Sequence, residues 1–258
     1  MTPLAALLAR RIRAGGPIPL SDYMAECLLH PQHGYYTTRP PFGSAGDFIT
    51  APEISQMYGE LLGLCLAQSW LDAGAPAQIT LAELGPGRGT LMADVLRATA
   101  RVPGFHAAAE VVLLEASPRL RATQGQALAG SAPRWITAPQ DLPPAPLYLL
   151  ANEFFDALPI RQFTRVGNAW AETVVGLAQD QLTLGRAPPA PLAALAHRLG
   201  DTAPGDVVEI CPGAGPVMQA VAARIAAHGG LALVVDYGGW TSLGDTFQAL
   251  QAHAPADP

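Results

Sequence analysis

Charged residues are scarce in this sequence, and lysine is absent, since the fifteen basic residues are all arginine. Only 14% of the 258 residues are charged, and the formal net charge is −6. A protein that binds nucleic acid by broad neutralisation of phosphates needs a basic surface. We therefore expect no nucleic acid among the partners of this protein.

Cysteines and long apolar segments are also few. Cys27, Cys65 and Cys211 lie far apart and form no C-x-x-C pair. Such an odd, sparse set suits a reducing compartment better than a disulfide framework. No apolar run approaches the roughly 20 residues that a membrane-spanning helix needs, so we expect no membrane insertion. No cluster of residues with metal-ligand spacing or serine-histidine-aspartate triad stands out, and we expect no metal.

The N-terminal segment MTPLAALLARRIRAGG allows two interpretations. It carries three arginines and no acidic residue before Asp22, which is typical of a mitochondrial presequence. Its apolar residues also recur at helical spacing. We favour the second interpretation, a first amphipathic helix over residues 4–14.

Apolar runs bounded by turns alternate with helical patterns from residue 78 onward. The runs predict strands over residues 78–84, 110–115, 134–138, 146–154 and 231–237, and the patterns predict helices over 90–102, 117–130 and 215–230. This alternation is typical of a parallel sheet with helices on both faces. We therefore expect an α/β, Rossmann-like domain over residues 76–258. An insertion at about 160–205 interrupts it, and within this insertion residues 162–185 alternate like a β-ribbon.

Residues 1–75 are predicted to form a helical cap with a substrate loop. Ser21 is a candidate N-cap for the helix DYMAECLLH. Residues 30–55 are rich in glycine, proline and aromatics, and loops of this length are usually functional. Residues 53–73 show a helical pattern. Its apolar positions are Ile54, Met57, Leu61, Leu64, Leu66 and Trp70.

The stretch LAELGPGRGTL, residues 81–91, places three glycines directly after the first predicted strand of the sheet. Compared with the dinucleotide fingerprint G-x-G-x-x-G, the third glycine comes one residue early, and Pro86 removes an N–H that a pyrophosphate would use. S-adenosylmethionine has no phosphate and needs a backbone that approaches closely. The loop therefore favours S-adenosylmethionine, bound at Gly85, Gly87 and Gly89, over a nicotinamide dinucleotide or a structural turn.

Two carboxylates at strand ends support this ligand. Glu83 lies near the position of the aminocarboxypropyl end, and Glu115 ends the second strand, where it can accept hydrogen bonds from the ribose hydroxyls. They are 32 residues apart, about one βαβ unit. Each has a structural alternative: Glu83 as a partner of the next helix dipole, and Glu115 as a surface carboxylate.

Six sequence strings occur in one order along nearly the whole chain. They are HPQHGYY (30–36), GDFITAPEISQMYGELLG (46–63), LAELGPGRGTLMADVLR (81–97), NEFFDALPIRQF (152–163), DYG (236–238) and GDTFQAL (244–250). Together they resemble the family of the mitochondrial complex I assembly arginine methyltransferase and its bacterial homologues, within the class I S-adenosylmethionine-dependent methyltransferases.

This resemblance implies a methyltransferase that modifies a protein substrate on arginine, with a complex I core subunit as one candidate. It implies the cytoplasm if the protein is bacterial and the mitochondrial matrix if it is eukaryotic, and it leaves a homodimer open. Where class I sheets normally continue into an antiparallel strand pair, this chain has only about twenty residues after residues 231–237. We therefore expect the pair to be missing and a sheet edge to be exposed.

The acceptor chemistry points to the end of the predicted strand 146–154. Arginine stays protonated in proteins, so a guanidinium acceptor needs carboxylates that orient it and localise its charge. Glu153, Asp156 and Asn152 are the candidates for this catalytic role, and the amide of Asn152 can instead contact cofactor or substrate. Asp156 can alternatively cap the turn that follows the strand.

Three further residues are candidate substrate contacts. Phe154 can stack on the guanidinium plane. Asp47 and Glu53 can close over the site from the glycine- and proline-rich loop, although Glu53 also suits the first turn of the next helix. A second hypothesis stays open beside the enzyme: a non-catalytic assembly factor that uses the same cleft to hold a partner subunit.

Overall fold

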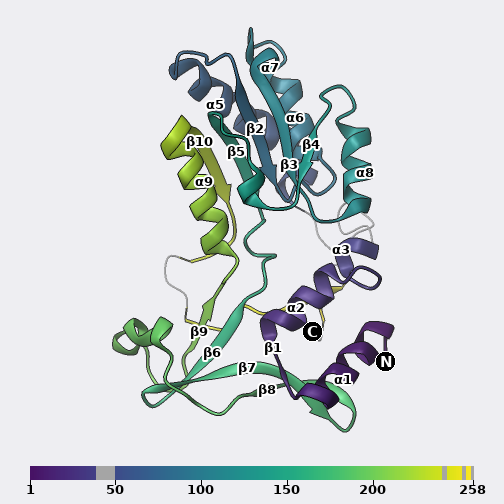
Figure 1. The fold of residues 1–258 in the computed structure, drawn as a ribbon, viewed down its shortest axis with the longest axis vertical. Helices are drawn as coiled ribbons and strands as arrows, with labels where there is room; N and C mark the ends of the chain where they lie inside the picture. Colours follow the sequence, from purple (N-terminus) through teal and green to yellow (C-terminus); the bar gives the residue numbers. More distant parts are fainter. Residues whose placement is uncertain (39–49, 240–242, 252–253, 257–258) are drawn as a thin grey trace.

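The computed structural model describes residues 1–38, 50–239, 243–251 and 254–256. Two five-stranded sheets organise this part of the chain, one parallel and one antiparallel. Figure 1 shows the parallel sheet and its helices in the upper half of the molecule and the antiparallel sheet below them.

The parallel sheet has the strand order β10-β5-β2-β3-β4. Its strands are β2 (Ile79–Leu84), β3 (Ala109–Leu114), β4 (Arg134–Ile136), β5 (Leu147–Asn152) and β10 (Gly230–Val235). β2 lies at the centre, with β3 on one side and β5 on the other, so the strand order reverses there. This arrangement confirms the predicted Rossmann-like α/β fold and creates a switch point at the carboxyl end of β2.

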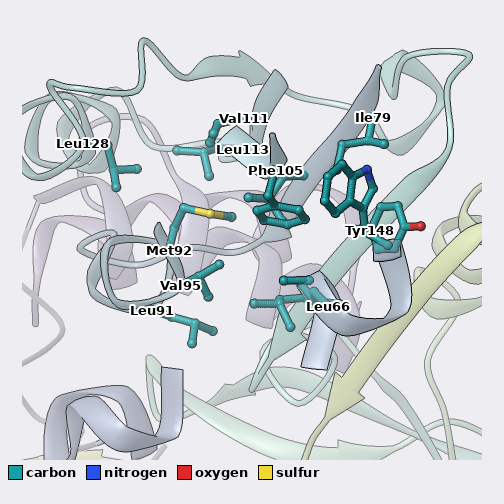
Figure 2. Close-up of a cluster of buried hydrophobic side chains, with 14 residues drawn as sticks. Leu66, Ile79, Leu91, Met92, Val95, Phe105, Val111, Leu113, Leu128 and Tyr148 are labelled. Atoms are coloured by element: carbon teal, nitrogen blue, oxygen red, sulfur yellow. The ribbon is translucent and has the colours of Figure 1, made fainter. Parts of the chain in front are cut away.

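Helices cover both faces of the parallel sheet. They are α5 (Gln56–Asp72), α6 (Thr90–Thr99), α7 (Phe105–Ala108), α8 (Pro118–Ala127) and α9 (Ala214–His228), with a short 3-10 turn, η1 (Pro139–Asp141). Along β2 the side chains alternate between the faces. Leu81 belongs to the apolar cluster under α5 and α6, whereas Ala82 belongs to the cluster under α9. Figure 2 shows the first cluster, in which Met92 and Val95 of α6 surround Phe105.

Helix α5 packs through a face that the apolar pattern did not predict. Leu66 and Trp70 are buried as expected, but Met57 and Leu61 are each 62% exposed. The remaining predicted apolar positions, Ile54 and Leu64, are exposed as well. The reason is that two glycines of α5, Gly59 and Gly63, allow a much closer approach to α6 than large side chains would.

Gly59 and Gly63 bring α5 into direct contact with α6. A Cβ on Gly59 would lie 2.7 Å from Cβ of Asp94, and a Cβ on Gly63 would lie 2.9 Å from Cα of Val95. Because the helices meet through these small residues, Met57, Leu61 and Leu64 turn outward, whereas Leu66 and Trp70 pack into the core. The predicted single helix is also divided, since Ser55 ends α4 (Ala51–Ile54) and accepts a hydrogen bond that caps α5.

The antiparallel sheet contains the predicted β-ribbon and two strands that were not predicted. Its order is β1-β7-β6-β9, with β8 also paired to β7. The strands are β1 (Ile18–Pro19), β6 (Arg161–Val166), β7 (Ala169–Ala178), β8 (Gln181–Arg186) and β9 (Val207–Ile210), and η2 (Ala193–Gly200) precedes β9. Because β1 pairs with β7, the N-terminal segment and the insertion share one sheet.

The N-terminal helices are α1 (Pro3–Gly15), α2 (Leu20–Leu29) and α3 (Tyr35–Thr38). Leu8 and Ile12 of α1 are buried in a cluster with Val175 of β7, so the favoured amphipathic helix forms. The predicted N-cap Ser21 is wrong, because α2 begins one residue earlier at the fully buried Leu20. The short helices α3 and α4 lie within the segment that was expected to be irregular.

The outer edge of β10 has no strand partner among the residues that the structure describes. The short strands β11 (Ala249–Gln251) and β12 (Ala254–Ala256) pair with each other instead. Val234 and Val235 of β10 are about two-fifths exposed, at 42% and 41%. Over the described ranges, no helix has the length and apolar character to cross a membrane.

The α5–α6 contact predicts the effect of adding one methyl group. Alanine normally stabilises a helix relative to glycine by about 1 kcal/mol. At Gly63 the new methyl would overlap the Val95 backbone, so we expect Gly63→Ala to lower the free energy of unfolding by roughly 1–3 kcal/mol. The measurement is urea denaturation followed by circular dichroism. The control Leu61→Ala, on the exposed face, should change stability by less than about 0.5 kcal/mol; a stabilised Gly63→Ala variant would refute the close contact.

Candidate cofactor and acceptor site

The carboxyl ends of the parallel strands bring most candidate residues to one edge of the sheet. β2 ends just before the glycine loop, β3 ends before Glu115, and β5 ends at Asn152. β10 lies beside β5 and is followed by Asp236. In open parallel sheets this edge is where ligands bind, at the point where the strand order reverses.

The glycine loop adopts a backbone that only glycine accommodates easily. Gly85, Gly87 and Gly89 have φ angles of +62°, +52° and +85°. Side chains strongly disfavour this left-handed region. A Cβ on Gly85 would also lie 2.9 Å from the ring of Phe154, and Gly89 is the N-cap of α6. The loop thus exposes bare backbone at the end of β2, as a closely bound ligand requires.

Glu83 places a buried carboxylate beneath this loop. Its residue is only 3% exposed, and its Oε2 atom has no hydrogen-bond partner in the described part of the chain. The pKa of Glu83 is raised to about 8, mainly by burial. A hydrogen bond from the backbone of Met92 lowers this pKa, and the charge of Glu115 raises it. The Met92 bond comes from the first turn of α6, so the helix-dipole alternative explains part of the environment. The unpartnered oxygen still needs a donor.

Glu115 is held in a fixed orientation at the end of β3. The backbone N–H of Ser117 donates to Oε1 at 2.7 Å, and Nε2 of Gln124 donates to Oε2 at 3.0 Å. Arg121 donates to the carbonyl oxygen of Glu115 at 2.9 Å. The residue is 8% exposed, so it is not the surface carboxylate of the alternative interpretation. Burial raises its pKa, and the bonds from Ser117 and Gln124 lower it.

A chain of hydrogen bonds links Tyr58 to the acceptor candidates. The hydroxyl of Tyr58 donates to Oδ1 of Asn152 at 2.5 Å, and Nδ2 of Asn152 donates to Oε1 of Glu153 at 3.3 Å. Glu153 has a φ of +49°, a conformation that a residue with a side chain rarely adopts. Its N–H donates to the carbonyl oxygen of Val235 in β10 at 2.9 Å. This strained residue is therefore anchored from both sides, a common property of functional positions.

Asp156 lies in the turn after Glu153, close to a second carboxylate, Asp236, which directly follows β10. Oδ2 of Asp236 accepts hydrogen bonds from the N–H groups of Phe155 and Asp156, at 2.9 and 3.2 Å. Desolvation, Asp236 and Glu153 together raise the pKa of Asp156 to about 6, although it also accepts a bond from the backbone of Ala157. The turn-capping alternative is thus part of its environment. No group of metal-ligating side chains that could hold an ion occurs within the described ranges.

Glu53 and Phe154 both lie on the glycine-loop side of the site. Glu53 accepts hydrogen bonds from Oγ1 of Thr90 at 2.7 Å and from Arg88 at 3.3 Å, which ties α4 to the start of α6. Phe154 lies against Gly85. Asp47, the other residue expected from the loop, lies outside the described residues.

One cavity joins the two groups of candidates. Its lining includes Glu83 and Gly85 on the cofactor side, Asn152 and Glu153 on the acceptor side, and Glu53 across from them. These side chains come from β2, the glycine loop, the end of β5 and α4. Residues far apart in the chain therefore face a common space.

Besides Tyr58, the structure adds two residues to this site for which the sequence indicated no role. They are Tyr36 and Gln124. Burial and the carboxylates of Asp156, Glu115 and Glu153 raise the pKa of Tyr36 to about 12. Its carbonyl oxygen accepts a bond from the Ser117 hydroxyl at 2.8 Å. Its place in the string HPQHGYY was the available signal. The other residue is the buried Gln124, for which no sequence pattern gave a signal.

A family model described as "Putative S-adenosyl-L-methionine-dependent methyltransferase" matches residues 61–258. The chain belongs to this family. It is 36% identical to the protein arginine methyltransferase NDUFAF7, mitochondrial, of Danio rerio, over 95% of this chain and 64% of the relative. It is 35% identical to the human protein of the same name, over 98% of this chain and 63% of the relative.

A solved structure agrees with these relatives. A crystal structure from Burkholderia thailandensis, bound to S-adenosyl-homocysteine, superposes with a TM-score of 0.77 at 32% identity, covering 92% of this chain and 62% of that one. The chain thus spans somewhat less than two thirds of the proteins that it matches. The family resemblance inferred from the six strings is confirmed.

The residues at the sheet edge fit the cofactor of this family. The unpartnered Oε2 of Glu83 suits an ammonium group, because charge-assisted hydrogen bonds are the strongest that a carboxylate makes. The left-handed glycines leave room for a ligand against the backbone. Glu115, buried and oriented, retains lone pairs for the ribose hydroxyls.

The buried carboxylate predicts a pH-dependent stability. Because folding raises the pKa of Glu83 from 4.5 to about 8, its protonated form stabilises the fold below pH 4.5, and this contribution is lost as the pH rises through 8. We expect Glu83→Gln, which cannot ionise, to be more stable than the wild type at pH 9 by about 2 kcal/mol. Urea denaturation at pH 5, 7 and 9 measures this.

The matched control for this prediction is Glu110→Gln. Glu110 lies on the neighbouring strand β3 and forms an exposed ion pair with Arg134. Its replacement should shift stability by less than about 1 kcal/mol and leave the pH dependence unchanged. Equal pH profiles for the wild type and Glu83→Gln would contradict the account of Glu83.

Proposed function

We propose that this chain binds S-adenosylmethionine at the glycine loop and transfers its methyl group to the guanidinium of a protein arginine. The observation that carries the proposal is the common cavity, in which the unpartnered carboxylate of Glu83 and the acceptor candidates Asn152 and Glu153 face one space. The names of the zebrafish and human relatives and the S-adenosyl-homocysteine in the Burkholderia structure support it.

The residues on the cofactor side bind S-adenosylmethionine and orient it. Glu83 pairs with the ammonium of the methionine part, the glycine loop forms the floor, and Glu115 holds the ribose. Glu53 bridges Arg88 and Thr90 and so keeps the loop in place. When bound, S-adenosylmethionine supplies a methyl group on a sulfonium, and the protein contributes mainly the position of the nucleophile relative to it.

The acceptor side orients a cation. Glu153 lines the cavity, and Asp156 and Asp236 lie close enough to it for the three charges to interact, so together these carboxylates would attract a guanidinium. Hydrogen bonds to carboxylates localise the charge of the guanidinium and leave another nitrogen as the better nucleophile. Asp156, with a pKa of about 6, is mostly ionised at neutral pH and can take up the proton that the guanidinium releases.

The finer identity of the partner follows the family resemblance. We propose a subunit of respiratory complex I as the protein substrate, met in the cytoplasm if the protein is bacterial and in the mitochondrial matrix if it is eukaryotic. We also propose that residues 1–75 act as a cap beside the cofactor domain, and a homodimer is compatible with this arrangement. Helix α3 supports the cap, because Arg119 of α8 donates to the carbonyl oxygen of Thr38 at 2.7 Å.

The proposal predicts a separation between binding and transfer. With tritiated S-adenosylmethionine and complex I subunits of the source organism, we expect methylarginine in the acid hydrolysate. Glu153→Gln should lower the transfer rate roughly 100-fold or more, because its carboxylate acts on the acceptor. Its affinity for S-adenosyl-homocysteine should change much less.

Glu60→Gln serves as the control for this variant. Glu60 pairs with Arg97 on the surface of α5 and α6, outside the cavity, so its replacement should leave transfer unchanged. If the wild type binds S-adenosyl-homocysteine but produces no methylarginine on any subunit, the assembly-factor hypothesis replaces the enzyme.

A further inference from the structure

Gln124 of α8 is a fully buried amide in contact with three other segments of the cofactor edge. Its exposed fraction is 0%. Nε2 donates to the carbonyl oxygen of Gly87 at 2.8 Å and to Oε2 of Glu115 at 3.0 Å. Oε1 accepts from the indole N–H of Trp135, in β4, at 2.8 Å. The two amide hydrogens and the oxygen are therefore all used.

The orientation of this amide follows from its partners. An indole N–H can only donate, so it must face the amide oxygen, while a carbonyl and a carboxylate can only accept and must face the NH₂ group. Trp135 thus fixes which way Gln124 points. The amide then connects the glycine loop after β2 to the carboxylate at the end of β3.

We infer that Gln124 is the positioning residue of the cofactor site, setting the distance between the glycine loop and the ribose-binding carboxylate of Glu115. The inference rests on the proposed cofactor, and it extends that proposal to a residue that need not touch the ligand. The contact of α8 with the loop is close, since a Cβ on Gly89 would lie 3.5 Å from Cα of Gln124.

Positioning matters here because Glu115 must present particular lone pairs. Ser117 occupies Oε1 and Gln124 occupies Oε2, which leaves the other lone pairs of both oxygens for two ribose hydroxyls. Without the amide, Oε2 of Glu115 loses its donor, and the bond from Ser117 to Oε1 alone holds the carboxylate less firmly. The carbonyl oxygen of Gly87 in the glycine loop at the same time loses its bond from Gln124, so the pairing of β2 with β3 remains but the amide no longer links the loop to Glu115.

Two variants and a matched control test this role. Gln124→Met keeps the length of the side chain and removes its hydrogen bonds. Gln126→Met makes the same change two residues along the same helix, at an exposed position. Trp135→Phe is the milder variant, because it keeps an aromatic ring and removes only the donor that orients Gln124.

The first readout is calorimetric titration of the purified chain with S-adenosyl-homocysteine. We expect Gln124→Met to weaken binding at least tenfold, Trp135→Phe to weaken it about threefold, and Gln126→Met to leave it within twofold. Because Trp135 acts through Gln124, the double variant should bind as weakly as Gln124→Met alone. Losses that multiply in the double variant would show independent packing effects and overturn the inference.

The second readout is selectivity for the ribose, which a general loss of packing would not change. The wild type should prefer S-adenosyl-homocysteine over its 2′-deoxy analogue, and Gln124→Met should lose most of this preference. An undiminished preference in Gln124→Met overturns the inference even where both affinities fall.

These outcomes are distinct from a failure of the proposed function. If the wild type binds neither S-adenosyl-homocysteine nor its analogue, the cofactor proposal fails and the role of Gln124 fails with it. If the wild type binds and Gln124→Met binds equally well, only the role of Gln124 is refuted.

Discussion

The site depends on the buried carboxylate of Glu83, near the end of the central strand, whose Oε2 atom has no hydrogen-bond partner among the described residues. Desolvation of the ionised form of this group opposes the stability of the free protein, and no donor to Oε2 lies within the part of the chain that the structure describes. A buried polar atom without a partner is retained at sites where a bound ligand supplies the missing hydrogen bond. The close α5–α6 contact through Gly59 and Gly63, together with the bridge from Glu53 to Thr90, holds the surrounding elements in place.

Each of the two sheets positions a different part of the site. The parallel sheet presents the cofactor residues at one edge, and the turn after β5 leads directly from the acceptor candidates into β6 of the antiparallel sheet. Because β1 joins that sheet, the N-terminal helices are fixed relative to the same turn. Tyr36 of α3 comes close to the charge of Glu153, and Tyr58 of α5 contacts Asn152, both from segments that lie far upstream of Glu153.

The sequence predicted the features that local residue patterns determine. It missed the features that depend on contacts between segments far apart in the chain. Apolar runs that alternate with helical patterns predicted the parallel sheet, and the same runs placed Glu83 and Glu115 at the ends of two of its strands, because these patterns are local. The buried face of α5 was not predictable from the apolar pattern. The glycines on this face are not counted as apolar positions, whereas the exposed Met57 and Leu61 are. The role of Gln124 was not predictable either, because it depends on hydrogen bonds to Trp135 and Gly87 that only the folded chain brings together.

The most direct test of the account is calorimetric titration of the chain at pH 7 with S-adenosyl-homocysteine, and with NAD as the comparison, in two buffers of different ionisation enthalpy. Since Glu83 has a pKa of about 8, it is mostly protonated at pH 7 and must ionise to pair with the ligand ammonium. The account predicts binding of S-adenosyl-homocysteine with release of about one proton, and no binding of NAD. Comparable binding of NAD, or binding of S-adenosyl-homocysteine without proton release, would contradict it.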